Sequence, residues 1–190
     1  ELPKGILIWR ALLQWLGGIG IVVIALVILP FLRIGGMQLF RMESSDGSEK
    51  ATPRTTQLVA YISFIYLVIS LVCAFAYWSA GMSGFDAMAH AMTTIATGGY
   101  STYDASIAYF GSATIEYIAI VFMLIGSLPF VLYLRALRGN TRSLFRDDQV
   151  RLFLLIVAVS IFLVTYYRYN MGVEIDTALR EAAFNVVSII

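Results

Sequence analysis

The stretch Thr97-Gly98-Gly99-Tyr100-Ser101 lies within a long segment, between Arg54 and Arg135, that contains neither lysine nor arginine. An apolar segment flanks this glycine-bearing loop on each side, and basic residues bound each apolar segment at its far end. A membrane protein can place backbone carbonyls at membrane depth with one helix that enters the membrane, a short re-entrant helix that ends in a glycine turn, and a second helix that leaves. The pattern predicts an all-α membrane protein with the layout of a cation pore.

The composition points to the same class of protein. The chain is 59% hydrophobic and 13% charged, with a mean hydropathy of +0.82, whereas soluble domains average about 25% charged residues. The net charge of +1 and the lack of a basic tract give no reason to expect nucleic acid as a partner. The single cysteine, Cys73, lies in an apolar run and is expected to be a core residue.

Four segments are long and apolar enough to cross a bilayer, which takes about 20 residues in a helix. They are residues 6–32, 58–78, 115–134 and 152–167. Pro30 and Pro129 fall late in the first and third of these and are expected to kink or end the helices. The sequence therefore predicts a multi-pass protein.

The distribution of positive charge predicts the orientation. Segments 33–54 and 135–151 are basic, whereas segment 79–114 carries only Asp86 and Asp104 as full charges. Because basic loops stay in the cytoplasm, we expect 33–54 and 135–151 to be cytoplasmic and 79–114 to be periplasmic. The start of 33–54 is compatible with an interfacial helix or with a partner-docking surface.

A weak internal repeat supports this layout. Leu29-Pro30-Phe31 recurs as Leu128-Pro129-Phe130, and the segment before Ile190 resembles the one before Thr97. We interpret the repeating unit as helix, pore helix, loop and helix, and expect both chain ends to be cut from a larger protein. The expected parts are the second helix of repeat 1 (1–32), a linker (33–54), a complete repeat 2 (55–136), a loop (137–151), and the first helix and pore helix of repeat 3 (152–190).

The expected pore helix covers residues 83–96, about 21 Å at 1.5 Å per residue. Ser83 followed by Asp86 has the spacing of a helix N-cap with an acidic partner in the first turn. If the helix enters from the outside, its partially negative C-terminal end points toward the membrane centre and favours a cation there.

The loop after this helix has the residues that a carbonyl-lined passage needs. Glycine tolerates the unusual backbone angles that aim successive carbonyls the same way, and such carbonyls can replace the hydration shell of K⁺. We expect Thr97, Gly98, Gly99 and Tyr100 to line the filter, with Thr93, Thr94 and Ser101 supporting it. K⁺ would be the only metal there, with no transition metal. The alternative is that Gly98-Gly99 forms an ordinary tight turn.

Two stretches carry a resemblance to a known family. Residues 91–102, together with Asp104-Ala105-Ser106, resemble the second pore loop of the TrkH potassium-uptake proteins. Trp9-Arg10 and the Gln14-Trp15-Leu16-Gly17-Gly18-Ile19-Gly20 stretch resemble the segment after that family's first filter. Pro53-Arg54 and Arg146-Asp147-Asp148 fit as well, so the resemblance covers essentially the whole chain. Tyr100 stands where the family usually has phenylalanine, a conservative change.

The resemblance implies the Trk/Ktr/HKT superfamily, in which four non-identical repeats of one polypeptide surround one pore. It implies potassium uptake across the bacterial inner membrane, a homodimer in the lipid bilayer, and a cytosolic nucleotide-binding gating subunit, TrkA. K⁺ would be the transported ion, with no other cofactor and no enzymatic activity. A sodium-permeable or non-selective transporter and a non-conducting scaffold remain alternatives. So does an intramembrane enzyme using His90. Channel and ion-coupled symporter are both open.

Four further residues have more than one interpretation. His90, the only histidine, is expected to be packed and hydrogen-bonded rather than to bind metal or move protons. Glu116 could complement the helix dipole or attract cations at the outer mouth. Arg10 and Arg168, near the outer ends of their helices, are each expected to extend to the interface or pair with an acid.

Overall fold

The computed structural model describes residues 2–32, 51–137, 139 and 146–190, and these residues form helices and connecting turns without a β-strand. The all-α prediction is confirmed. The elements are α1 (Lys4–Leu32), α3 (Ala51–Ser79), α4 (Gly84–Ile95), the 3₁₀ helix η1 (Ser106–Phe110), α5 (Ala113–Ser127), α6 (Phe130–Leu137), α8 (Asp148–Asn170) and α9 (Ile175–Ile189).

Within the described ranges, three helices are long and apolar enough to cross a membrane: Lys4–Ile24, Gln57–Ser79 and Asp148–Asn170. A fourth span is possible if α5 and α6 are counted together. These segments overlap the four predicted ones; they begin one to four residues earlier, and the first ends at Ile24 instead of residue 32. Most of the basic residues behind the orientation prediction, including Arg33, Arg41 and Arg142, lie outside the described residues.

The fourth candidate span is sharply broken. α5 ends at Ser127, Leu128 has an extended backbone, and α6 leaves at 89° to α5 after Pro129. Proline removes a helical hydrogen bond and disfavours helical geometry in the residue before it, as the sequence predicted for Pro129. By contrast, α1 continues through Pro30 to Leu32, so the two similar tripeptides have different backbones.

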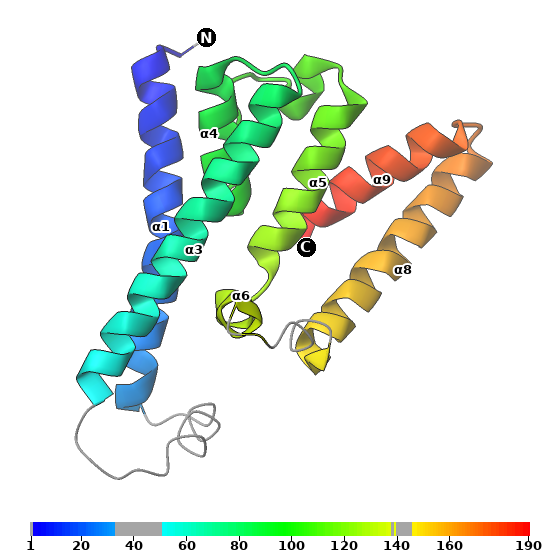
Figure 1. Ribbon diagram of the computed structural model, residues 1–190. Coiled ribbons are helices and arrows are strands. Elements are labelled where there is room, and N and C mark those ends of the chain that lie inside the picture. The colour runs from blue at the N-terminus through cyan, green and yellow to red at the C-terminus, as the bar shows by residue number, and fades with distance from the viewer. Residues whose placement is uncertain (1, 33–50, 138, 140–145) are drawn as a thin grey trace.

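Two short helices share one placement in the fold. Figure 1 shows that α4 and α9 both begin at the end of the molecule where the α3–α4 and α8–α9 turns lie, and that both stop partway along the longer helices. α4 has 12 residues and α9 has 15, too few for a span. Both are therefore re-entrant with respect to the longer helices.

The core consists of two clusters. The larger lies among α3, α4, α5 and α6 and includes the fully buried Cys73 and Tyr77 together with Ile95, so the expected packing role of Cys73 is confirmed. The smaller joins α5, α8 and α9 through Ile120 and Val157, with valines from α9. Alanines on the buried face of α4 allow close packing, and α4 is thereby enclosed by α1, α3 and α5.

Candidate functional site

The site begins where α4 starts. Ser83 has an extended backbone, its Oγ accepts a hydrogen bond from the Asp86 main-chain N–H at 3.1 Å, and the same hydroxyl donates to Asp86 Oδ2 at 2.6 Å. The predicted N-cap with an acidic first-turn partner is thus present. This local arrangement fixes the first residue of α4.

The C-terminal end of α4 closes with a Schellman motif. The Gly98 N–H donates to Thr93 O at 2.8 Å, the Thr97 N–H donates to Thr94 O at 3.2 Å, and Thr97 is left-handed with φ +51°. Glycine usually occupies that left-handed position, and a β-branched residue there is an outlier. Strain of this kind tends to persist at functional sites, so it indicates Thr97 as a candidate functional residue of the loop.

The backbone of residues 97–99 alternates in handedness. Thr97 and Gly99 have positive φ, +51° and +74°, whereas Gly98 does not. A Cβ added at Gly99 would meet nothing within 4 Å, but one added at Gly98 would collide with the side-chain amide of Gln14. Gly99 is therefore required by its backbone angle, as expected. At Gly98 a Cβ would instead push the Gln14 amide out of its place, a contact that the sequence did not reveal.

The four expected filter carbonyls divide into two pairs. Gly98 O accepts a hydrogen bond from Gln14 Nε2 at 2.9 Å, and Tyr100 O accepts one from Thr93 Oγ1 at 2.8 Å. The carbonyls of Thr97 and Gly99 accept no hydrogen bond from any described residue. The structure therefore turns the Gly98 and Tyr100 carbonyls toward surrounding protein and leaves the other two available.

The other expected support residues have different partners. Thr93 joins α4 to the loop through Tyr100, whereas Thr94 Oγ1 pairs with the buried Tyr77 hydroxyl of α3 at 3.0 Å. Thr94 therefore contacts the helix behind α4 instead of the loop. Thr97, which lies just beyond the C-terminal end of α4, has an exposed side chain.

Asp86 ties the start of α4 to the segment beyond the loop. Its Oδ1 accepts from Thr102 Oγ1 at 2.7 Å, and its Oδ2 lies 3.4 Å from the Tyr103 hydroxyl. Partial burial, followed by the negative charge of Asp86, raises the pKa of Tyr103 to about 12. The phenol therefore remains protonated at neutral pH and can donate to the carboxylate.

His90 and Ser101 form a second link between α4 and the loop. His90 Nδ1 lies 2.8 Å from Asp86 O, and because a carbonyl only accepts, Nδ1 carries the proton. Nε2 is then the acceptor for Ser101 Oγ at 2.9 Å, and the Ser101 hydroxyl in turn accepts from the Tyr103 N–H at 3.1 Å. His90 is buried, with both ring nitrogens bonded, in agreement with the expected packed, hydrogen-bonded histidine.

Tyr100 faces α1 at the C-terminal end of the loop. Its ring is half exposed, and the Arg10 guanidinium lies over it, 4.3 Å from the ring centroid. This is a cation–π contact. Sequence reasoning had anticipated an interfacial position or an acidic partner for Arg10, and had no signal for an aromatic ring 90 positions away.

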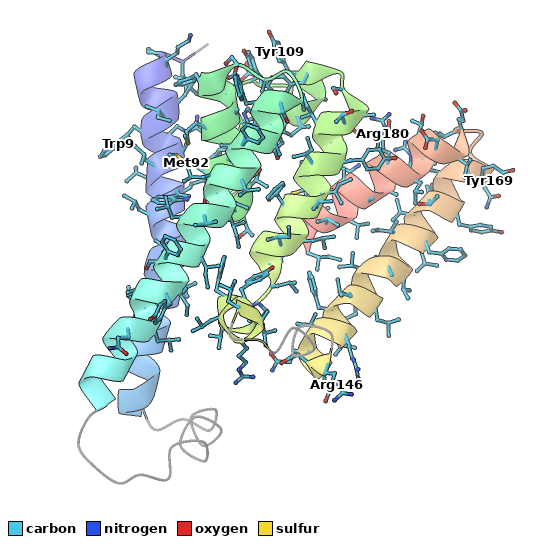
Figure 2. All side chains as sticks on the ribbon, in the orientation of Figure 1. Trp9, Met92, Tyr109, Arg146, Tyr169 and Arg180 are labelled. Atoms are coloured by element: carbon cyan, nitrogen blue, oxygen red, sulfur yellow. The ribbon has the colours of Figure 1, made fainter. Side chains whose placement is uncertain are left out.

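Two ion pairs fasten α9 to its neighbours. Arg180 of α9 donates to Glu116 of α5 at 2.6 Å, with both side chains less than one-fifth exposed, and Arg168 of α8 pairs with Glu181. Figure 2 shows Arg180 on α9 in the region beside α5. The acidic partner expected as one option for Arg168 is present. Glu116 takes an arginine partner that sequence reasoning missed, as it missed the role of Gln14.

Comparison with known proteins identifies relatives of the whole chain. Residues 1–174 match the model of the TrkH family, described as cation transport protein. The chain is 46% identical to the Trk system potassium uptake protein TrkI of Halomonas elongata over all of its own length and 39% of the relative's. It is 42% identical to TrkH of Vibrio parahaemolyticus, again over its whole length and 40% of the relative's.

A solved structure has the same fold. The crystal structure of the potassium transporter TrkH from Vibrio parahaemolyticus superposes with a TM-score of 0.85 at 38% identity, covering all of this chain and 38% of that one. The chain thus spans about two-fifths of the length of these relatives. From the family match and the shared fold, the chain belongs to the TrkH family of cation transport proteins.

Proposed function

We propose that this chain is part of the membrane-spanning subunit of a Trk potassium uptake system and supplies one of four loops of its selectivity filter. The observation that carries the proposal is the loop at the end of the re-entrant helix α4. There the left-handed Thr97 and Gly99 alternate with Gly98, and the Thr97 and Gly99 carbonyls remain unpaired among described residues. The relatives' names, potassium uptake proteins, support K⁺ as the transported ion.

The physical mechanism is replacement of hydration. The partially negative C-terminal end of α4 lies at the loop, which favours a cation there. Carbonyl oxygens of Thr97 and Gly99 would take the place of water around a partly dehydrated K⁺. Thr93, through Tyr100, and Ser101, through His90, would keep the loop from collapsing onto the ion.

The proposal extends to architecture and surroundings. Residues 55–136 would form the complete second repeat, with 1–32 ending the first and 152–190 beginning the third. The subunit would form a homodimer in the bacterial inner membrane and be gated by cytosolic TrkA. Figure 2 shows Arg146 at the opposite end of the molecule from Tyr109 and Tyr169, which supports placing 135–151 in the cytoplasm and 79–114 in the periplasm.

The test uses the full-length protein in a bacterium that lacks its own potassium uptake. The unaltered protein should restore growth at limiting K⁺, and Gly99→Val should abolish the rescue, because φ +74° is strongly disfavoured for a β-branched residue and relief of the strain moves the peptide. Gly111→Val is the matched control, since Gly111 also has positive φ, +55°, and open space around its Cβ position, but lies outside the loop.

Three results would oppose the proposal. An unaltered protein that reaches the membrane without restoring growth argues against potassium uptake. Unchanged uptake and K⁺ over Na⁺ preference in Gly99→Val argue for a scaffold. A His90→Gln variant that retains the loop's ion preference but loses a chemical activity would favour the intramembrane enzyme, since His90 already has a hydroxyl partner in Ser101.

A further inference from the structure

Gln14 crosses from α1 to the candidate filter loop. Its Nε2 donates to Gly98 O at 2.9 Å, although the two residues are 84 positions apart. Figure 1 shows α1 running alongside α4. The Gln14 carboxamide fills the space that a Cβ at residue 98 would need. A side chain at residue 98 would thus displace the Gln14 amide from the Gly98 carbonyl.

The helix that carries Gln14 is itself fixed against α3. Trp15 Nε1 donates to Ser70 Oγ at 2.9 Å, and the Tyr66 hydroxyl donates to Trp15 O at 3.0 Å. One turn further along α1, a Cβ added at Gly18 would come within 3.0 Å of the Tyr66 hydroxyl and 3.2 Å of Ala96 Cβ. α1 therefore cannot slide or rotate freely, and the Gln14 amide is delivered to a defined point.

The bond decides which way one peptide of the loop faces. Because Gly98 O points to Gln14, the Gly98–Gly99 peptide plane is fixed, and this constrains the direction of the Thr97 and Gly99 carbonyls on either side. The second carbonyl turned toward the protein, Tyr100 O, is held by Thr93 of α4. The two carbonyls that face the protein are thus held by different helices, Tyr100 O by α4 and Gly98 O by α1.

The side chain of Gln14 also carries an energetic cost. Its Oε1 is buried and has no hydrogen-bond partner among the described residues. A buried acceptor without a partner is unfavourable, and an apolar side chain of similar shape would avoid it. The acceptor end of Gln14 therefore adds nothing to the stability of the fold, and the contribution of this residue lies in the hydrogen bond that its donor makes to Gly98 O.

We propose that Gln14 is a positioning and specificity-determining residue for the ion pathway, acting through Gly98. The proposal rests on the proposed function, since it presumes that the Thr97 and Gly99 carbonyls contact K⁺. By the repeat assignment, α1 belongs to the unit before α4. The direction of the second loop's carbonyls is then set by a side chain from the preceding repeat.

The experiment measures K⁺ uptake by the full-length protein, with Na⁺ as competitor. Gln14→Met removes the donor without adding charge, and Gln14→Glu replaces it with an acceptor that repels Gly98 O. Both should raise the KM for K⁺ about tenfold and lower K⁺ over Na⁺ discrimination by a similar factor, as expected for loss of a buried hydrogen bond. Gln57→Met and Gln57→Glu are matched controls at an exposed position of α3.

A merely structural role predicts a different result. Loss of packing would reduce the amount of protein and hence the maximal rate, with KM and ion preference unchanged. Gln14→Met should instead reach the membrane at normal levels, because removal of the unpaired Oε1 offsets the loss of the hydrogen bond to Gly98 O. Normal KM and discrimination in Gln14→Met overturn the proposal, even if Gln14→Glu is impaired, since both lose the donor.

A double substitution tests the contact itself. Gly98→Ala alone should push the flexible Gln14 amide away from Gly98 O, because the new Cβ would lie 2.4 Å from it, and should raise the KM for K⁺ as Gln14→Met does. Adding Gln14→Met should then raise KM no further, a non-additivity expected of residues in contact. Additive effects of the two changes oppose the proposal. If the unaltered protein takes up no K⁺, the proposed function fails; if it does and the Gln14 variants match it, only this inference fails.

Discussion

The two re-entrant helices α4 and α9 start at the same end of the molecule but are held by different chemistry. α4 is joined to its own following loop by short hydroxyl and imidazole hydrogen bonds around one carboxylate, all within residues 83–103. α9 has no side-chain cap at Glu174 and is joined by two ion pairs to α5 and α8.

The position of α4 is constrained locally, by bonds within its own segment. The position of α9 is constrained through neighbouring helices, which we call a relayed constraint. The α4 network closes within 21 consecutive residues, so these bonds between α4 and its loop do not pass through a neighbouring helix, although Gln14 of α1 also holds the Gly98 carbonyl. The position of α9 depends on α5 and α8, because its charged partners lie on those helices. A shift of α5 would therefore be transmitted to α9 through Glu116 and leave α4's internal bonds intact.

The largest effect is expected from breaking the local network. Asp86→Asn removes the charge that accepts from Ser83 and Thr102, and replaces one carboxylate oxygen with a donor. The free energy of unfolding should fall by about 3 kcal/mol, since hydrogen bonds to a buried charged group are the stronger kind. Thermal unfolding of the purified full-length protein in detergent measures it.

The control for this variant is Asp104→Asn. Asp104 is exposed on the segment that follows the loop, so the same chemical change there should alter stability by less than about 0.5 kcal/mol. Equal shifts for the two variants would mean that the network around Asp86 contributes nothing beyond surface charge.

A smaller effect is expected from breaking the relayed constraint. Glu116→Gln leaves the Arg180 guanidinium, less than one-fifth exposed, without its carboxylate, at a cost of about 2 kcal/mol. Hydrogen exchange should quicken in 175–189 and stay unchanged in 84–95. Asp148→Asn is the control, since its pair with Arg151 is largely exposed and is worth at most about 0.5 kcal/mol. Faster exchange in both helices would show that α4 also depends on α5.

The sequence predicted what depends on near neighbours along the chain. The four spans follow from apolar length, the start of α4 from the Ser83 and Asp86 spacing, and the break after α5 from Pro129. Each of these has its cause within a few residues, so a pattern in the sequence is sufficient to find it.

Contacts between distant segments escaped prediction. The Gln14–Gly98 and Glu116–Arg180 bonds join residues 84 and 64 positions apart. Their existence depends on how α1 packs on α4 and α5 on α9, which one sequence does not specify. Gly98 shows this clearly, because its glycine was attributed to backbone angle, whereas the left-handed positions of the loop are Thr97 and Gly99.

The smallest expected effect has the opposite sign and concerns the strained end of α4. Thr97→Gly relieves a β-branched residue at φ +51°, a conformation costing roughly 1–2 kcal/mol, and adds unfolded-state entropy that opposes roughly half of this gain. Thermal unfolding should show stability rising by about 0.5–1 kcal/mol, while K⁺ uptake falls because the carbonyl-bearing peptide becomes freer to rotate. Ser106→Gly, at φ +56° outside the loop, should give a similar gain with normal uptake. Were Thr97→Gly to keep full uptake, the strain would serve no transport purpose and the local network would only stabilise the fold.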